Sequence, residues 1–119
     1  MQNSKINNKN KLKISHWNAN GIKSKLTELK YYIQKHNIDV MLINETKIEN
    51  KKECNVNGYK CFRKDHNVAG GGELIYVKNE IECNEIQFNT NNLEAVGLQL
   101  RDKLTIVSAY LPPNLLPVK

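Results

Sequence analysis

The chain of 119 residues contains few cysteines and no long apolar run. Its three cysteines, Cys54, Cys61 and Cys83, lack the C-x-x-C spacing of a zinc or redox motif, and their odd number argues against a disulfide framework. This usage indicates a reducing, intracellular setting. The sequence shows no apolar segment typical of a secretion signal or a membrane span, so we expect no membrane partner.

Common nucleotide-binding and zinc-binding motifs are also lacking. The GGGE string at Gly70 to Glu73 has no Lys followed by Ser or Thr at the Walker spacing and no G-x-G-x-x-G pattern. Its glycines are better explained by a tight turn or by close backbone packing. The three histidines, His16, His36 and His66, do not have the spacing of a zinc site. We find neither an internal repeat nor a domain linker.

The composition is that of one basic domain with a modest core. Hydrophobic residues make up 39% of the chain, its net charge is +6 and its sequence pI is near 9.2. This charge favours a polyanionic partner such as nucleic acid, although many basic proteins have none. Residues 1–11 are rich in Asn and Lys and are predicted to form a disordered basic leader.

The first third of the chain predicts a strand-helix-strand unit. Residues 12–17 form a short strand candidate that ends at the turn formers Asn18 to Gly21. Ser24 is a candidate helix cap, and apolar residues then recur at helical spacing until about Asn37. Residues 40–43 are all apolar, which indicates a strand buried on both faces. If the two strands are parallel, Asn18 and Glu45 lie at the same edge of the sheet, where open α/β sheets bind ligands.

The remainder of the chain predicts short strands that pair as hairpins. The candidates cover residues 59–63, 74–77, 93–100 and 104–110, with a tight turn at 101–103. Pro112 and Pro113 end the last strand because proline cannot donate a ladder hydrogen bond. We expect a mixed α/β fold whose second part is antiparallel.

Four polar residues are candidates for chemistry. Magnesium prefers oxygen ligands and is often held by one or two carboxylates, a role that Glu45 fits. Asn18 is a candidate oxygen ligand or phosphate-orienting amide, and Asn20 a weaker second phosphate contact. Tyr110 is a candidate donor to a phosphoryl oxygen. From local chemistry alone, an exposed strand-end Glu, turn-forming asparagines and a half-buried Tyr explain the same residues.

The ordered strings ISHWNANGI, VMLINETKI, AGGGELIYVKN and VSAYLPPN resemble the endonuclease/exonuclease/phosphatase family. They are most similar to the N-terminal endonuclease of jockey-type non-LTR retrotransposons. The resemblance implies that residues 12–119 are the N-terminal half of a four-layer α/β sandwich with mixed, largely antiparallel sheets, truncated at its C-terminal side. It also implies phosphodiester hydrolysis with Mg or Mn, Glu45 as the metal ligand, and Asn18 and Tyr110 as catalytic residues.

Two positions depart from the family pattern. The repair nucleases have an acidic residue at Asn20, and retrotransposon sequences usually have an apolar residue at Glu73, so this position is a local departure or the mark of a degraded copy. The family's downstream GDFN and Ser-Asp-His strings, which carry the general base, do not follow Pro113.

The resemblance therefore predicts an incomplete, inactive fragment of an endonuclease that nicks DNA, with a reverse transcriptase downstream and action in the nucleus. One alternative is a repair nuclease for abasic DNA or another phosphoesterase of the family. The other is a non-catalytic nucleic-acid-binding remnant, with a basic face at Arg63, Lys64 and Lys78 beside Tyr59 and Tyr76.

Overall fold

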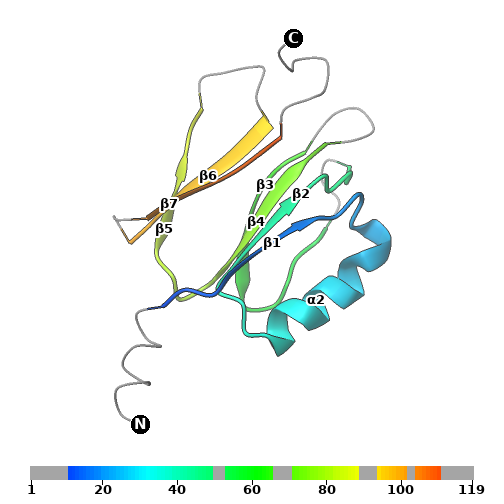
Figure 1. Cartoon of the computed structure of the whole chain (residues 1–119), viewed down its shortest axis with the longest axis horizontal. Coiled ribbons are helices and arrows are strands. Elements are labelled where there is room, and N and C mark those ends of the chain that lie inside the picture. Colours follow the sequence, from blue (N-terminus) through cyan, green and yellow to red (C-terminus); the bar gives the residue numbers. More distant parts are fainter. Residues whose placement is uncertain (1–10, 50–52, 66–70, 89–93, 102–103, 111–119) are drawn as a thin grey trace, which may run out of the picture.

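The chain forms two β-sheets and one α-helix within the residues described by the computed structural model, which are 11–49, 53–65, 71–88, 94–101 and 104–110 (Figure 1). Apart from Lys11, the predicted leader lies outside these residues. The strands are β1 (Ile14–Asn18), β2 (Val40–Asn44), β3 (Tyr59–Lys64), β4 (Glu73–Lys78), β5 (Cys83–Ile86), β6 (Glu94–Leu100) and β7 (Leu104–Tyr110). A short 3-10 helix, η1 (Lys23–Lys25), leads into the helix α2 (Leu26–Lys35).

The first sheet has the strand order β1-β2-β4-β3, and the second has the order β5-β6-β7. Strands β1 and β2 are parallel, with Asn18 opposite Asn44 at their carboxyl ends, while every other described pair is antiparallel. Helix α2 covers one face of the first sheet and the second sheet packs on the other (Figure 1). The predicted mixed α/β class with largely antiparallel sheets is confirmed.

Strand β2 is buried because both of its faces are covered. Met41 and Ile43 belong to the core beneath α2, together with Leu29 and Ile33 of the helix. The alternate residues Val40 and Leu42 belong to the core between the two sheets. This two-sided burial explains the uninterrupted apolar run of the sequence.

Two details differ from the sequence prediction. Ser24 lies within η1, and α2 begins at Leu26 with Lys25 as its N-cap and no side-chain capping bond. The tight turn replaces the expected cap because it already directs the chain into the helix. Strand β5 was not predicted, since its sequence CNEI is short and polar and has no apolar alternation.

Candidate active site

Asn18 and Glu45 meet at the carboxyl edge of the first sheet. Asn18 is the last residue of β1, and Glu45 directly follows β2. The side-chain Nδ2 of Asn18 donates a hydrogen bond to Oε2 of Glu45 at 3.1 Å. The parallel register therefore brings together two side chains 27 positions apart. Their contact is observed, whereas their roles in metal and phosphate binding remain predictions.

Backbone hydrogen bonds extend the alignment of β1 and β2 into the loops that follow them. Three amides of the WNANG turn and its neighbour donate to carbonyls of the NET segment: Ala19 to Asn44 at 2.9 Å, Gly21 to Glu45 at 2.8 Å and Ile22 to Thr46 at 3.0 Å. Glu45 itself has a φ of +54°, a conformation that is uncommon for residues other than glycine. The paired loops hold it in that conformation, so its carboxylate has a defined direction.

The glycine-rich segment supports the same loop from the other side. The amides of Thr46 and Lys47 donate to the carbonyls of Gly72 and Gly71 at 3.2 and 2.9 Å. A Cβ on Gly72 would lie 2.2 Å from Oγ1 of Thr46, whose side chain is buried. The close packing expected for the GGGE string is confirmed at Gly72.

Asn20 and Tyr110, the other two predicted site residues, are not part of the contact between Asn18 and Glu45. Asn20 is exposed, has a φ of +49°, and accepts a hydrogen bond from Nζ of Lys47 through its side-chain oxygen. The backbone of Tyr110 ends β7 opposite Glu94, but its side chain lies outside the described part of the structure. The geometry thus tests neither residue's predicted contact with phosphate.

A buried polar cluster lies directly behind the candidate site. Glu73 is 0% exposed, and its Oε1 accepts hydrogen bonds from Nδ2 of Asn44 and, at 3.0 Å, from Oγ of Ser108. Nδ2 of Asn44 also lies 3.2 Å from Oγ of Ser108 and 3.3 Å from the carbonyl oxygen of Ala109. None of these residues was predicted as a site residue. The available signals were the position of Asn44 beside Glu45 and a charged residue at the start of an apolar strand.

The residues at the sheet edge fit a divalent cation that has few protein ligands. Mg²⁺ commonly takes one or two protein carboxylates and fills its other positions with water and substrate phosphate. Glu45 offers a half-exposed carboxylate beside the Asn18 amide. Across the described ranges, no three or more His, Cys, Asp and Glu side chains gather into a metal-binding group. A single carboxylate such as that of Glu45 suits an ion whose other ligands are water and substrate phosphate.

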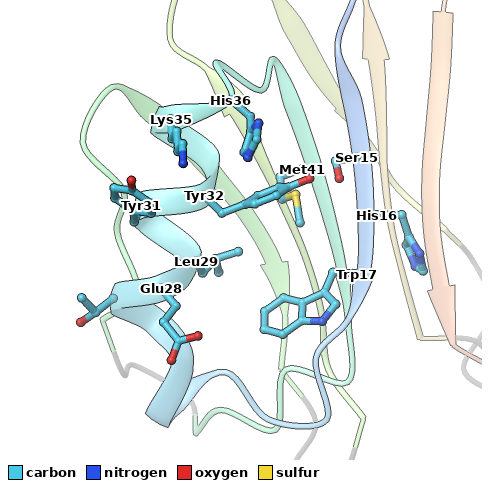
Figure 2. A pocket seen from close by; sticks show the side chains of 11 residues that line it. Ser15, His16, Trp17, Glu28, Leu29, Tyr31, Tyr32, Lys35, His36 and Met41 are labelled. Carbon is cyan, nitrogen blue, oxygen red and sulfur yellow. The ribbon is translucent and has the colours of Figure 1, made fainter.

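A groove of about 800 Å³ runs between α2 and β1, on the helix side of the sheet. Figure 2 shows Trp17, Tyr32 and Met41 lining it, while His16 points away toward the second sheet. There Nε2 of His16 contacts Oδ1 of Asn44. The groove is largely aromatic and apolar, so the polar chemistry lies elsewhere, at the strand ends.

The predicted basic face is only partly present. Arg63 forms an ion pair with Asp65 at 2.8 Å, and Lys78 forms one with Asp39 at 3.1 Å. Tyr76 is fully buried in the core beneath α2 and donates to the backbone oxygen of Cys54. It therefore cannot stack on a nucleic acid, because the sheet and the preceding loop enclose it.

The thiols of Cys54 and Cys61, in the same region, both have shifted pKa values. Nη1 of Arg63 lies 3.0 Å from Sγ of Cys54. A hydrogen bond from Cys61, aided by the positive charge of Arg63, lowers the pKa of Cys54 from 9.0 to about 6 although burial opposes this. The pKa of Cys61 is raised by the same hydrogen bond and by burial.

Comparison with known proteins identifies the relatives of this chain. No protein family model matches it. It is 31% identical over 109 residues to the RNA-directed DNA polymerase from mobile element jockey of Drosophila melanogaster, an alignment that covers 86% of this chain. It is 32% identical over 73 residues to the probable RNA-directed DNA polymerase from transposon X-element of the same organism, covering 59% of this chain.

Two solved structures share its architecture. An AP endonuclease from Archaeoglobus fulgidus superposes with a TM-score of 0.68 at 21% identity, and covers 84% of this chain. The 3′ phosphatase NExo from Neisseria, solved with a product DNA hairpin, superposes with a TM-score of 0.63 at 14% identity and the same coverage of this chain. The chain therefore has the fold of these two proteins, as its resemblance to the endonuclease/exonuclease/phosphatase family implies. Its sequence relatives place it with jockey-type retrotransposon proteins.

The chain spans only part of each of these proteins. It covers 12% of the jockey polymerase, 8% of the X-element polymerase and 41% of each solved chain. As for membranes, the described residues include no helix that is long and apolar enough to span one.

Proposed function

We propose that this chain is the metal-binding part of a retrotransposon-type endonuclease that hydrolyses a phosphodiester bond in DNA with Mg²⁺ or Mn²⁺. One observation carries the proposal: Asn18 and Glu45 meet at 3.1 Å, at the ends of parallel strands, in a fold shared with DNA-processing phosphoesterases. The jockey and X-element relatives favour the retrotransposon branch. On the same basis, the full protein would act in the nucleus and carry a reverse transcriptase downstream.

In this proposal, Glu45 holds the cation and Asn18 orients the carboxylate and the scissile phosphate. The hydrogen bond from Asn18 leaves the other carboxylate oxygen of Glu45 for the cation. A divalent ion bound there would stabilise negative charge on phosphoryl oxygens. Lys47, held beside Asn20, adds positive charge at the same edge.

The isolated chain is proposed to be inactive. Hydrolysis needs a positioned base for the attacking water and a group that stabilises the leaving oxygen. The solved relatives have more than half of their length outside the matched region, and there we place the missing groups.

The metal-binding step can be tested on the chain itself. Trp17 is its only tryptophan and directly precedes Asn18, so paramagnetic Mn²⁺ at Glu45 is expected to quench its fluorescence. Glu45→Gln should weaken Mn²⁺ binding at least about tenfold. Glu80→Gln removes an exposed carboxylate elsewhere and should leave binding unchanged. Equal binding by the two variants would refute the metal site.

Cleavage can be tested in the longer protein that contains this segment. It should nick supercoiled plasmid in the presence of Mg²⁺, and Glu45→Gln should lower the rate at least about a hundredfold. A protein that cut only abasic duplexes and left plasmid intact would instead favour the repair branch, which the AP endonuclease fold supports. Salt-sensitive DNA binding with no cleavage would favour a binding-only protein.

A further inference from the structure

Glu73 is a buried acidic residue between the two sheets, where a charged side chain is costly unless donors surround it. Its Oε1 has two such donors, Asn44 from β2 and Ser108 from β7. Strand β4, which carries Glu73, pairs with β2 so that Glu73 lies directly opposite Asn44. The three side chains therefore join both sheets at one point. A merely degraded position would not be expected to have two matched partners on two other strands.

The orientation of the Asn44 amide follows from its neighbours. Its Nδ2 faces three acceptors, which are Oε1 of Glu73, Oγ of Ser108 and the carbonyl oxygen of Ala109. Its Oδ1 faces Nε2 of His16, which must then carry the proton and donate. A flipped amide would set its oxygen against acceptors, so the cluster admits one orientation.

We propose that Asn44, Glu73 and Ser108 form an inter-sheet clamp that positions the candidate active site. Asn44 directly precedes Glu45, and the carbonyl that it contacts belongs to Ala109, which directly precedes Tyr110. The clamp thus ties the end of β2 to the end of β7. These residues are positioning residues: they contact no substrate, but they fix where Glu45 and the backbone of Tyr110 lie relative to each other.

The clamp gives a role to Glu73, the position where retrotransposon sequences usually have an apolar residue. An apolar residue at Glu73 would leave the Asn44 amide and the Ser108 hydroxyl without their shared acceptor between the sheets. This inference rests on the proposed function only for its consequence at Glu45. The clamp itself can be measured without metal.

The test compares clamp variants with a control of similar destabilisation. Ser108→Ala and Asn44→Ala remove donors of the clamp, whereas Ser108→Thr keeps the hydroxyl. Leu98→Ala truncates a fully buried residue of the same inter-sheet core that makes none of the clamp's hydrogen bonds. Mn²⁺ affinity is measured by quenching of Trp17, and thermal unfolding is measured in parallel.

Both clamp deletions should weaken Mn²⁺ binding about tenfold, the usual effect of losing a residue that orients a metal ligand. Ser108→Thr should bind within about threefold of the parent. Leu98→Ala should lower the melting temperature yet bind Mn²⁺ within about twofold, because destabilisation alone does not move Glu45. If the deletions bind Mn²⁺ as well as the parent does, or no worse than Leu98→Ala, the clamp has no positioning role and the inference is wrong.

A metal-free measurement separates this inference from the proposed function. The side-chain amide protons of Asn44 should exchange slowly with solvent in the parent and rapidly in Glu73→Leu, while amides in the middle of β4 stay protected. If the parent binds no Mn²⁺ but the Asn44 amide is protected in this way, the metal site fails and the clamp is supported. Rapid exchange of the Asn44 amide in the parent would overturn the clamp.

Discussion

Gly72 occupies a position where a side chain does not fit. It has a φ of +95°, and a Cβ there would lie 2.2 Å from Oγ1 of Thr46. Thr46 cannot move away easily because its side chain is buried and its amide donates to the Gly72 carbonyl. Gly72→Ala should therefore destabilise the protein by about 3 kcal/mol, from backbone strain plus overpacking, as measured by urea unfolding.

Gly58 is the matched control for that substitution. Its φ is +88°, but nothing lies within 4 Å of the Cβ that an alanine would add. Gly58→Ala should therefore lose only the backbone term, about 1 kcal/mol. Equal losses for the two variants would mean that the close approach to Thr46 has no energetic effect.

Cys54 leads to a prediction about pH. In the folded chain its pKa is lowered from 9.0 to about 6 by the hydrogen bond from Cys61 and by Arg63. Between these values the unfolded chain binds a proton that the folded chain has lost, so the contribution of Cys54 to stability rises with pH. This contribution is lost as the pH falls through about 6. The raised pKa values of Cys61 and Tyr76 keep both groups protonated across this window.

The measurement compares the melting temperatures of the parent and Cys54→Ser in steps from pH 6 to about pH 8.5. The advantage of the parent should grow steadily with pH. Cys83→Ser provides the control for removal of a thiol, because Cys83 is a free cysteine outside this cluster. A difference between the parent and Cys54→Ser that stays constant with pH would contradict the lowered pKa.

At the scale of elements, the sequence predicts those segments whose hydrophobic pattern is long enough to identify them. Strand β2 was predicted because its two-sided burial requires an unbroken apolar run. Helix α2 was predicted from helical spacing, but its start was not, since η1 replaces a side-chain cap with a backbone turn. Strand β5 has only four residues, and its pairing with β6 depends on a neighbour that its own sequence does not reveal.

Helix α2 is held mainly by its buried face. Ile33 is fully buried against the first sheet, so Ile33→Ala should destabilise the protein by about 3 kcal/mol through lost burial and a cavity. Tyr31 lies on the same helix but is 64% exposed, and Tyr31→Ala should change stability by less than about 1 kcal/mol. Chemical denaturation monitored by circular dichroism measures both. A comparable loss in the two variants would show that α2 does not depend on its buried face.

At the scale of the whole molecule, the sequence predicts contacts between residues on neighbouring strands of one sheet, but not contacts between the two sheets. The contact between Asn18 and Glu45 could be predicted because it requires only the assumption that the two strands of the strand-helix-strand unit are parallel. The partnership of Asn44 with Ser108 spans 64 positions and depends on how one sheet packs on the other. No local pattern encodes that packing, so the contacts of Asn44 and Glu73 with Ser108 could not be predicted from the sequence.

The second sheet leads to a prediction about association of the whole chain. Within the residues that the structure describes, β7 pairs with β6 alone, and its Val107 side chain is 45% exposed. An apolar edge strand offers unpaired backbone groups to another chain, so we expect the 119-residue chain to self-associate as its concentration rises. Val107→Lys should suppress this association, because a charged side chain on the edge cannot be buried between two copies without loss of its hydration.

Gln99→Lys is the control because it adds the same charge to an exposed position on β6, which is paired on both sides. Sedimentation velocity over a range of concentrations should show association of the parent and of Gln99→Lys but not of Val107→Lys. If both lysine variants dissociate equally, net charge and not the β7 edge controls the association. If all three proteins remain monomeric, the exposed edge of β7 does not mediate association.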